Sequence, residues 1–235
     1  MFHIFAANTF FSAYSQADFF GKLIFAALFL LSILSWAVLV YKVRETRSIK
    51  KSMHIFLKSV SSNKERLLQL QIKEEHPFAN IFRCLQQKTL EVLSKNHHFA
   101  EDKSHIYLSR ADLELIESSV LTTISSENKR LDKNLFLLSI TMSLAPFLGL
   151  LGTVWGILVT FSELQGGAKM GSSTAMLGGL STALATTVIG LIIAIPALVA
   201  HNFLKTSVHH LGSDMEDFLY EALAVIELQY RKIEE

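Results

Sequence analysis

The chain has 235 residues, a formal net charge of +1 and 50% hydrophobic residues. That length would fit one or two soluble domains, but the hydrophobic residues are concentrated in three long uncharged segments. The net charge indicates little by itself, and we expect no nucleic-acid partner. Cys84 is the only cysteine, which excludes a disulfide within the chain, and we expect it to be a buried, inert thiol.

Residues 23–41, 134–162 and 170–204 contain no Asp, Glu, Lys or Arg. A bilayer span needs about 20 apolar residues. We therefore predict an all-α membrane protein with transmembrane helices over residues 23–41, 134–162 and 174–204. The third uncharged segment exceeds one span, so its first residues belong to a predicted periplasmic loop over residues 163–173.

Basic residues are concentrated between the first and second spans. Residues 42–133 hold 17 of the 22 Lys and Arg residues. The positive-inside rule therefore predicts that residues 1–22 are periplasmic and that residues 42–133 and 205–235 are cytoplasmic. Because the positive charge follows the first apolar segment instead of preceding it, we expect an uncleaved anchor and not a signal peptide.

The region between the first two spans has the composition of helices. Apolar residues recur at helical spacing after Val43, Ser61-Ser62-Asn63 interrupts that spacing, and His76-Pro77 predicts a second break. Asn96-His97-His98 indicates a turn. We expect these helices to form a cytoplasmic bundle.

Two long helices are predicted to join the membrane to this bundle. The helix with Leu113 and Ile116 on its apolar face meets no breaker before Leu135, so we predict one continuous rod into the second span. Residues 205–235 repeat the same spacing and are predicted to continue the third span. Spans two and three thus extend into the cytoplasmic bundle.

The second span contains residues that favour close helix packing. Gly149, Gly152 and Gly156 lie on neighbouring faces of one helix, and the last two form a small-xxx-small pair. Pro146 removes a backbone hydrogen bond and can bend its helix. The hydroxyl of Thr153 is a candidate polar contact, although a threonine in a membrane helix more often bonds its own backbone.

The third span is dense in hydroxyl groups. Thr182 and Thr186 are one turn apart and share a face, and Thr187 is next to them. Gly190 and Pro196 repeat the packing and bending residues of the second span.

Neither these spans nor the first contains an acidic residue. Proton relays in membranes generally use Asp, Glu or His, and His201 lies near the predicted cytoplasmic end of its span. A chain that moves protons this way needs a carboxylate from another chain. Adjacent histidines at 97–98 and 209–210 do not have metal-ligand spacing, and no enzyme signature is found, so we expect neither a metal site nor an enzyme.

The run from Ala145 to Gly156 resembles the second-span signature of the TolQ/ExbB/MotA proton-channel family, and the run from Gly179 to Ala197 resembles its third-span signature. The predicted topology agrees along the whole chain. Three spans are more similar to TolQ and ExbB than to the four-span flagellar stators.

The resemblance implies a homo-oligomer, expected to be a pentamer, in which spans two and three line a pore. A single-span partner similar to TolR or ExbD would supply the aspartate, and a TolA- or TonB-like protein would be energised. By motif position, Thr153 and Thr187 match the family's pore threonines, and Pro146 and Pro196 match its helix-bending prolines. No cofactor other than the ion gradient is implied.

The sequence departs from the resemblance at Thr182, where TolQ- and ExbB-like proteins commonly have a glutamate. Coupling to sodium therefore stays open beside coupling to protons. We expect a TolQ-like stator of the bacterial inner membrane that supports the outer membrane. The alternatives are an ExbB-like subunit that powers TonB-dependent uptake and a non-conducting membrane scaffold.

Overall fold

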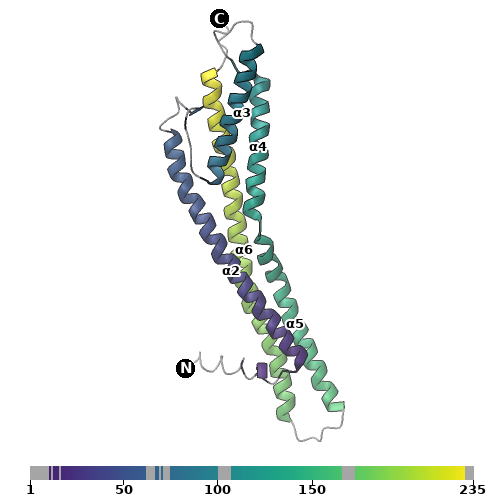
Figure 1. The fold of residues 1–235 in the computed structure, drawn as a ribbon. Helices are drawn as coiled ribbons and strands as arrows, with labels where there is room; N and C mark the ends of the chain where they lie inside the picture. Colours follow the sequence, from purple (N-terminus) through teal and green to yellow (C-terminus); the bar gives the residue numbers. More distant parts are fainter. Residues whose placement is uncertain are drawn as a thin grey trace. The chain divides into compact units, whose positions relative to one another are not determined.

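The computed structural model describes residues 11, 13–15, 17–61, 67–68, 70, 75–99, 107–165 and 173–230. Most of these residues lie in the helices α2 (Phe19–Ser61), α3 (Pro77–Phe99), α4 (Arg110–Asp132), α5 (Leu135–Gln165) and α6 (Ser173–Tyr230), which Figure 1 shows. The described part of the chain contains no strand. The predicted all-α class is therefore confirmed.

The helices form two compact units. The first contains Met1–Lys42 and Asn134–Leu204, and the second contains Val43–Lys133 and Lys205–Glu235. Helices α2 and α6 contribute residues to both. We call the first the apolar unit, because its spans are uncharged, and the second the four-helix unit, because parts of α2, α3, α4 and α6 form it.

Among the described residues, three helices are long and apolar enough to cross a membrane, as predicted: Phe19–Val60, Leu135–Ser162 and Leu177–Tyr230. Large apolar side chains of the apolar unit are exposed, including Phe29 (68%), Phe147 (67%) and Phe203 (64%). Apolar exposure on this scale is characteristic of a surface that meets lipid or another protein.

Small residues dominate the core of the apolar unit. Ala145 and Ala194 are buried there with Ile24 and Leu28. Ala183 is also buried. Because alanine has a short side chain, the helix backbones can approach closely.

The four-helix unit has a larger, aromatic core. The ring centroid of Phe56 in α2 lies 5.9 Å from that of Phe82 in α3 and 5.5 Å from that of Phe218 in α6. Ile116 and Val120 of α4 are fully buried. These side chains lie on the apolar faces that the helical spacing predicted.

Helices α3 and α4, which begin in this unit, start at capping residues. The backbone N–H of Ala79 donates to His76 Nδ1 at 3.1 Å, and Pro77 occupies the first position of α3, where its missing N–H costs least. Ser109 and Asp112 form a capping box at the start of α4. The break predicted at His76-Pro77 is thus the beginning of a helix.

Two predictions about helix continuity are wrong. Helix α4 ends at Asp132, and Asn134 has a φ of 74°, so α4 and the second span are separate helices and not one rod. Asparagine tolerates this left-handed conformation, which ends helices. Asn96-His97-His98 is not a turn but lies within α3.

The third span does continue without a break, because α6 runs from Ser173 to Tyr230. The predicted periplasmic loop falls largely on residues 166–172, outside the described residues. The ends of the predicted N-terminal and C-terminal segments, residues 1–10 and 231–235, also lie outside them.

Candidate functional site

Helices α5 and α6 approach each other most closely at the glycines of the second span. A Cβ atom added to Gly149 would lie 2.9 Å from the carbonyl oxygen of Thr186 and 2.9 Å from Thr187 Cα. A Cβ atom on Gly152 would overlap the Thr186 hydroxyl group. Since backbone atoms cannot rotate away, a side chain at Gly149 would push the two helices apart.

The same close approach continues in both directions along the pair. A Cβ atom added to Gly156 would lie 2.7 Å from Ala183 Cβ, and one added to Gly190 would lie 2.6 Å from the Ala145 carbonyl oxygen. The structure therefore places Gly149, Gly152, Gly156 and Gly190 at one helix–helix contact.

Three threonine hydroxyls gather at this contact around the carbonyl oxygen of Gly149. The Oγ1 atoms of Thr153, Thr186 and Thr187 lie 3.2, 3.2 and 3.0 Å from that oxygen. The hydroxyls of Thr153 and Thr187 also form a direct hydrogen bond. Because Thr153 belongs to α5 and the other two threonines to α6, the cluster joins the helices.

The cluster contains more hydrogen-bond acceptors than hydroxyl protons. A hydroxyl has one proton, and a carbonyl oxygen has two lone pairs, so the three hydroxyls cannot all donate to Gly149 at once. The Ala183 carbonyl oxygen is a second acceptor, 2.6 Å from Thr186 Oγ1 and 3.3 Å from Thr153 Oγ1. The hydroxyls of Thr153 and Thr187 can therefore change partners without losing their hydrogen bonds.

The predicted threonines differ in their access to an external group. Thr186 is only 2% exposed, whereas Thr153 and Thr187 are each half-buried. Thr182 lies outside the cluster, and its hydroxyl donates to the Gly178 carbonyl oxygen of its own helix at 2.9 Å. Thr153 and Thr187 are thus the pair that could contact a group from another chain.

Both predicted prolines lie inside continuous helices, Pro146 in α5 and Pro196 in α6. Each lacks an N–H, so the carbonyl groups of Met142 and Ile192 have no helical donor at these positions. Pro146 follows Ala145, which is fully buried, whereas Pro196 is exposed.

Asp18, for which no role was predicted, connects α2 to α5. Its Oδ1 accepts a hydrogen bond from the Gly21 N–H at 2.8 Å, and its Oδ2 accepts one from Trp155 Nε1 at 2.9 Å. The ring of Phe20 lies 4.4 Å from the Trp155 ring. Asp18 directly before an apolar run is an N-cap signature, but no spacing indicates a partner 137 residues away.

His201, His209 and His210 all lie in α6. His201 Nδ1 lies 3.3 Å from the Leu135 carbonyl oxygen, where α6 meets the beginning of α5. Among the described residues, no group of three or more His, Cys, Asp or Glu side chains could hold a metal ion. The rings of His209 and His210 are 6.3 Å apart.

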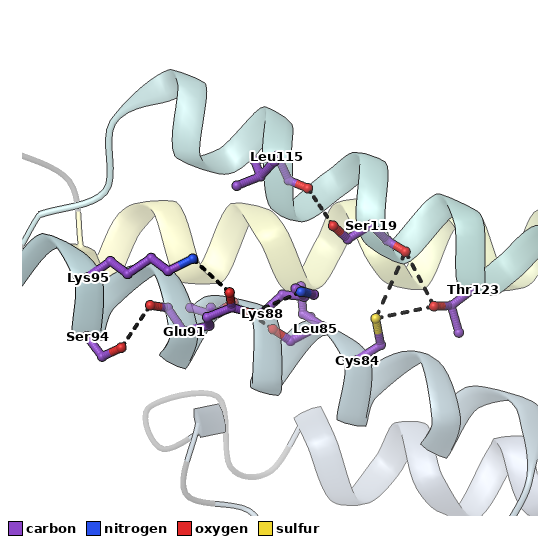
Figure 2. A network of polar contacts seen from close by, with 10 residues as sticks. Cys84, Leu85, Lys88, Glu91, Ser94, Lys95, Leu115, Ser119 and Thr123 are labelled. Atoms are coloured by element: carbon purple, nitrogen blue, oxygen red, sulfur yellow. Dashed lines mark hydrogen bonds and ion pairs between the residues drawn. The ribbon is translucent and has the colours of Figure 1, made fainter.

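Cys84 belongs to α3, and its thiol contacts α4 in the four-helix unit, as Figure 2 shows. The Thr123 hydroxyl donates to Cys84 Sγ at 3.2 Å, and Sγ lies 4.0 Å from the Ser119 carbonyl oxygen. The thiol is half-buried, so the expected burial is partial.

Glu91 lies on the same helix and binds two lysines, as Figure 2 also shows. Its Oε2 lies 2.9 Å from Lys88 Nζ, and its Oε1 lies 2.9 Å from Lys95 Nζ. Hydrogen bonds from the two ammonium groups lower the pKa of Glu91 to about 2.

Residues 73–217 match the MotA/TolQ/ExbB proton channel family. The chain is 42% identical to the biopolymer transport protein ExbB of Helicobacter pylori over 99 residues. These aligned residues make up 42% of this chain and 64% of that protein. It is 35% identical over 106 residues to the Tol-Pal system protein TolQ of Haemophilus influenzae, and these residues make up 45% of this chain and 46% of that protein. An ExbB of Neisseria meningitidis serogroup A is 26% identical over 205 residues, 84% of this chain and 88% of that protein.

The aligned residues thus span less than two thirds of the first two relatives. The family match is broader and includes both glycine-lined helices with the threonine cluster. With its apolar helices and this match over more than half of its length, the chain belongs to the MotA/TolQ/ExbB proton channel family of membrane proteins.

Proposed function

We propose that this chain is a stator subunit of an ion-driven motor in the bacterial inner membrane, similar to TolQ. It forms a ring, a homopentamer, around the single membrane span of a TolR- or ExbD-like partner. The partner brings a membrane aspartate that takes up and releases a proton. The resulting motion energises a TolA-like protein that supports the outer membrane.

The observation that carries this proposal is the threonine cluster in an uncharged helix pair. Residues 134–162 and 170–204 contain no Asp or Glu, whereas Thr153 and Thr187 offer half-buried hydroxyls with alternative acceptors. A site of this kind suits an aspartate that enters from another chain.

The two hydroxyls can form hydrogen bonds with such an aspartate in both its ionised and its protonated state. When it is ionised, Thr187 can donate to the carboxylate instead of to the Gly149 carbonyl oxygen, which is 3.0 Å away. When it is protonated, the carboxyl group can donate to a hydroxyl oxygen, which has two lone pairs. When the aspartate leaves, the hydroxyls donate again to the carbonyl oxygens of Gly149 and Ala183.

Thr187→Val tests this role, because valine keeps the shape of the side chain and removes the hydroxyl. We expect loss of motor function, measured as envelope integrity in cells, with normal membrane insertion and assembly. Thr160→Val is the matched control, since the Thr160 hydroxyl donates to the Gly156 carbonyl oxygen of its own helix at 2.8 Å. Normal envelope integrity in Thr187→Val would contradict the proposal.

A second candidate function is that of an ExbB-like subunit, which powers TonB-dependent uptake. The 42% identity to an ExbB protein of Helicobacter pylori favours it. Deleting the gene distinguishes the two, because a TolQ-like subunit supports envelope integrity and an ExbB-like subunit supports uptake through TonB-dependent receptors. Sodium stays the alternative ion, and replacing sodium with potassium in the medium tests it.

A further inference from the structure

Charged residues of the four-helix unit fall into two groups. On α3 and α4 many are in ion pairs within the chain: Glu91 with Lys88 and Lys95, Arg110 with Glu114, and Arg130 with Glu127. On α2 and α6 the exposed charges of Arg44, Arg47, Lys51, Glu216, Asp217 and Glu227 form no ion pair among the described residues. These six side chains are therefore candidates for ion pairs with another molecule.

The charge on α2 is mainly basic, and three of its basic residues share one face. Residues 43–61 contain five Lys or Arg residues and one Glu. At 3.6 residues per turn, Arg44, Arg47, Lys51 and Ile55 lie within roughly 80° of one another around the helix. All four are exposed, and Ile55 is 56% exposed. We call these four residues the basic face.

The charge on α6 is acidic. Residues 205–230 contain five Asp or Glu residues and one Lys. Glu216, Tyr220 and Glu227 lie within roughly 40° of one another around the helix. All three are exposed, Tyr220 by 51%, and the exposed Asp217 lies beside them. We call these four residues the acidic face.

We infer that the basic face of one subunit binds the acidic face of a second copy of the chain. The charges are opposite and nearly equal, and each face has an exposed apolar or aromatic side chain among its charges. Two different faces on one subunit make a heterologous contact, which closes into a ring when the rotation allows it. The inference rests on the proposed function in one respect, because it assigns the contact that would join the proposed ring.

Anionic lipid is a weaker candidate for the basic face. The headgroup layer of a bilayer extends roughly 5–8 Å beyond the hydrocarbon on each side. At 1.5 Å per residue, Arg44 follows Tyr41 by about 4.5 Å along the helix, but Lys51 follows it by about 15 Å. Headgroups at the end of the first span could therefore reach Arg44, whereas Lys51 and Ile55 lie beyond the headgroup layer.

Charge reversal tests the inference on the full chain in detergent. We expect Arg47→Glu with Lys51→Glu to weaken self-association by about tenfold, because several surface charge pairs become repulsive. Glu216→Lys with Asp217→Lys should do the same. Chains with all four changes should assemble again, since the charges are then exchanged between the faces. Lys129→Glu, at an exposed residue of α4 outside both faces, is the control and should leave the mass of the oligomer unchanged.

Mixed disulfides test the direction of the contact. In a Cys84→Ser background, one tagged chain carries Lys51→Cys and a differently tagged chain carries Glu216→Cys. On co-expression and mild oxidation, we expect disulfides mainly between the two kinds of chain. Disulfides mainly between identical chains would indicate a two-fold contact and overturn the inference.

The outcomes separate this inference from the proposed function. Reversals that leave the oligomer mass unchanged would overturn the inference, and the proposed function would stand if Thr187→Val still abolished it. If the Arg47 and Lys51 reversal instead reduced only binding to vesicles that contain phosphatidylglycerol, the basic face would be a lipid site. A wild-type chain that is monomeric under every condition would contradict both.

Discussion

The contacts inside the apolar unit differ in kind from the contacts inside the four-helix unit. In the apolar unit, glycines and alanines bring α5 and α6 together, and the hydroxyls of Thr153, Thr186 and Thr187 bond to backbone carbonyl oxygens. In the four-helix unit, Phe56, Phe82 and Phe218 fill the core, and ion pairs lie on the surface.

We propose that this difference follows from the surroundings of each unit, which are lipid for the apolar unit and water for the four-helix unit. In lipid, burial of apolar surface does not drive helices to associate, so close packing and hydrogen bonds must hold them together. In water, burial of large side chains is the dominant favourable contribution. The same chain therefore uses small residues in one unit and large ones in the other, and matched substitutions should differ between the two units in the size of their effects on stability.

The largest effect is expected from shortening a core aromatic side chain. Phe82 is 2% exposed in the four-helix unit, so Phe82→Ala should lower the free energy of unfolding by about 3–5 kcal/mol. Phe147→Ala is the matched change in the apolar unit, at a side chain that is 67% exposed, and should cost far less. Thermal unfolding of the full chain in detergent measures both, and similar melting temperatures for the two variants would contradict the comparison.

A smaller loss of stability is expected when a glycine at a helix–helix contact is replaced by a larger residue. Gly149→Ala places a methyl group against backbone atoms of Thr186 and Thr187, and overpacking of this kind costs about 1–3 kcal/mol. Gly212→Ala in the four-helix unit meets only the Asn128 side chain, which can move, and alanine favours helix. We expect the melting temperature to fall for Gly149→Ala and to stay nearly unchanged for Gly212→Ala.

The smallest effect concerns the pH dependence of the four-helix unit. Because its folded-state pKa is lowered from 4.5 to about 2, Glu91 contributes stability above pH 4.5, and this contribution is lost as the pH falls toward 2. Glu91→Gln should therefore lower the melting temperature slightly at pH 7, and the two proteins should converge near pH 2. A difference that persists at pH 2 would mean that Glu91 acts through packing and not through its charge.

The broad architecture could be predicted because lipid imposes a strong constraint on sequence. The charge-free segments correspond to three apolar helices, and α6 is continuous. The end of α4 was missed because Asn134 is neither glycine nor proline, yet it adopts a φ of 74°. Asn96 was placed in a turn, but its side chain donates to Asp112 Oδ2 at 2.9 Å, a tertiary contact that no local pattern indicates.

The candidate site was only partly predictable for a similar reason. The resemblance to the family's motifs singled out Thr153 and Thr187 among the hydroxyl residues of the two spans, and the glycine spacing indicated close helix packing. The carbonyl oxygens of Gly149 and Ala183 have no sequence signal, because every residue has one. Their positions around the hydroxyls depend on the packing of α5 against α6.

Proton flux is the most direct test of the central claim that the aspartate comes from another chain. The purified chain is placed in vesicles with an imposed proton gradient, alone and with a single-span partner that carries a membrane aspartate. We predict little flux through the chain alone, and flux with the partner that is lost when its aspartate is changed to asparagine. Substantial flux through the chain alone would contradict the account.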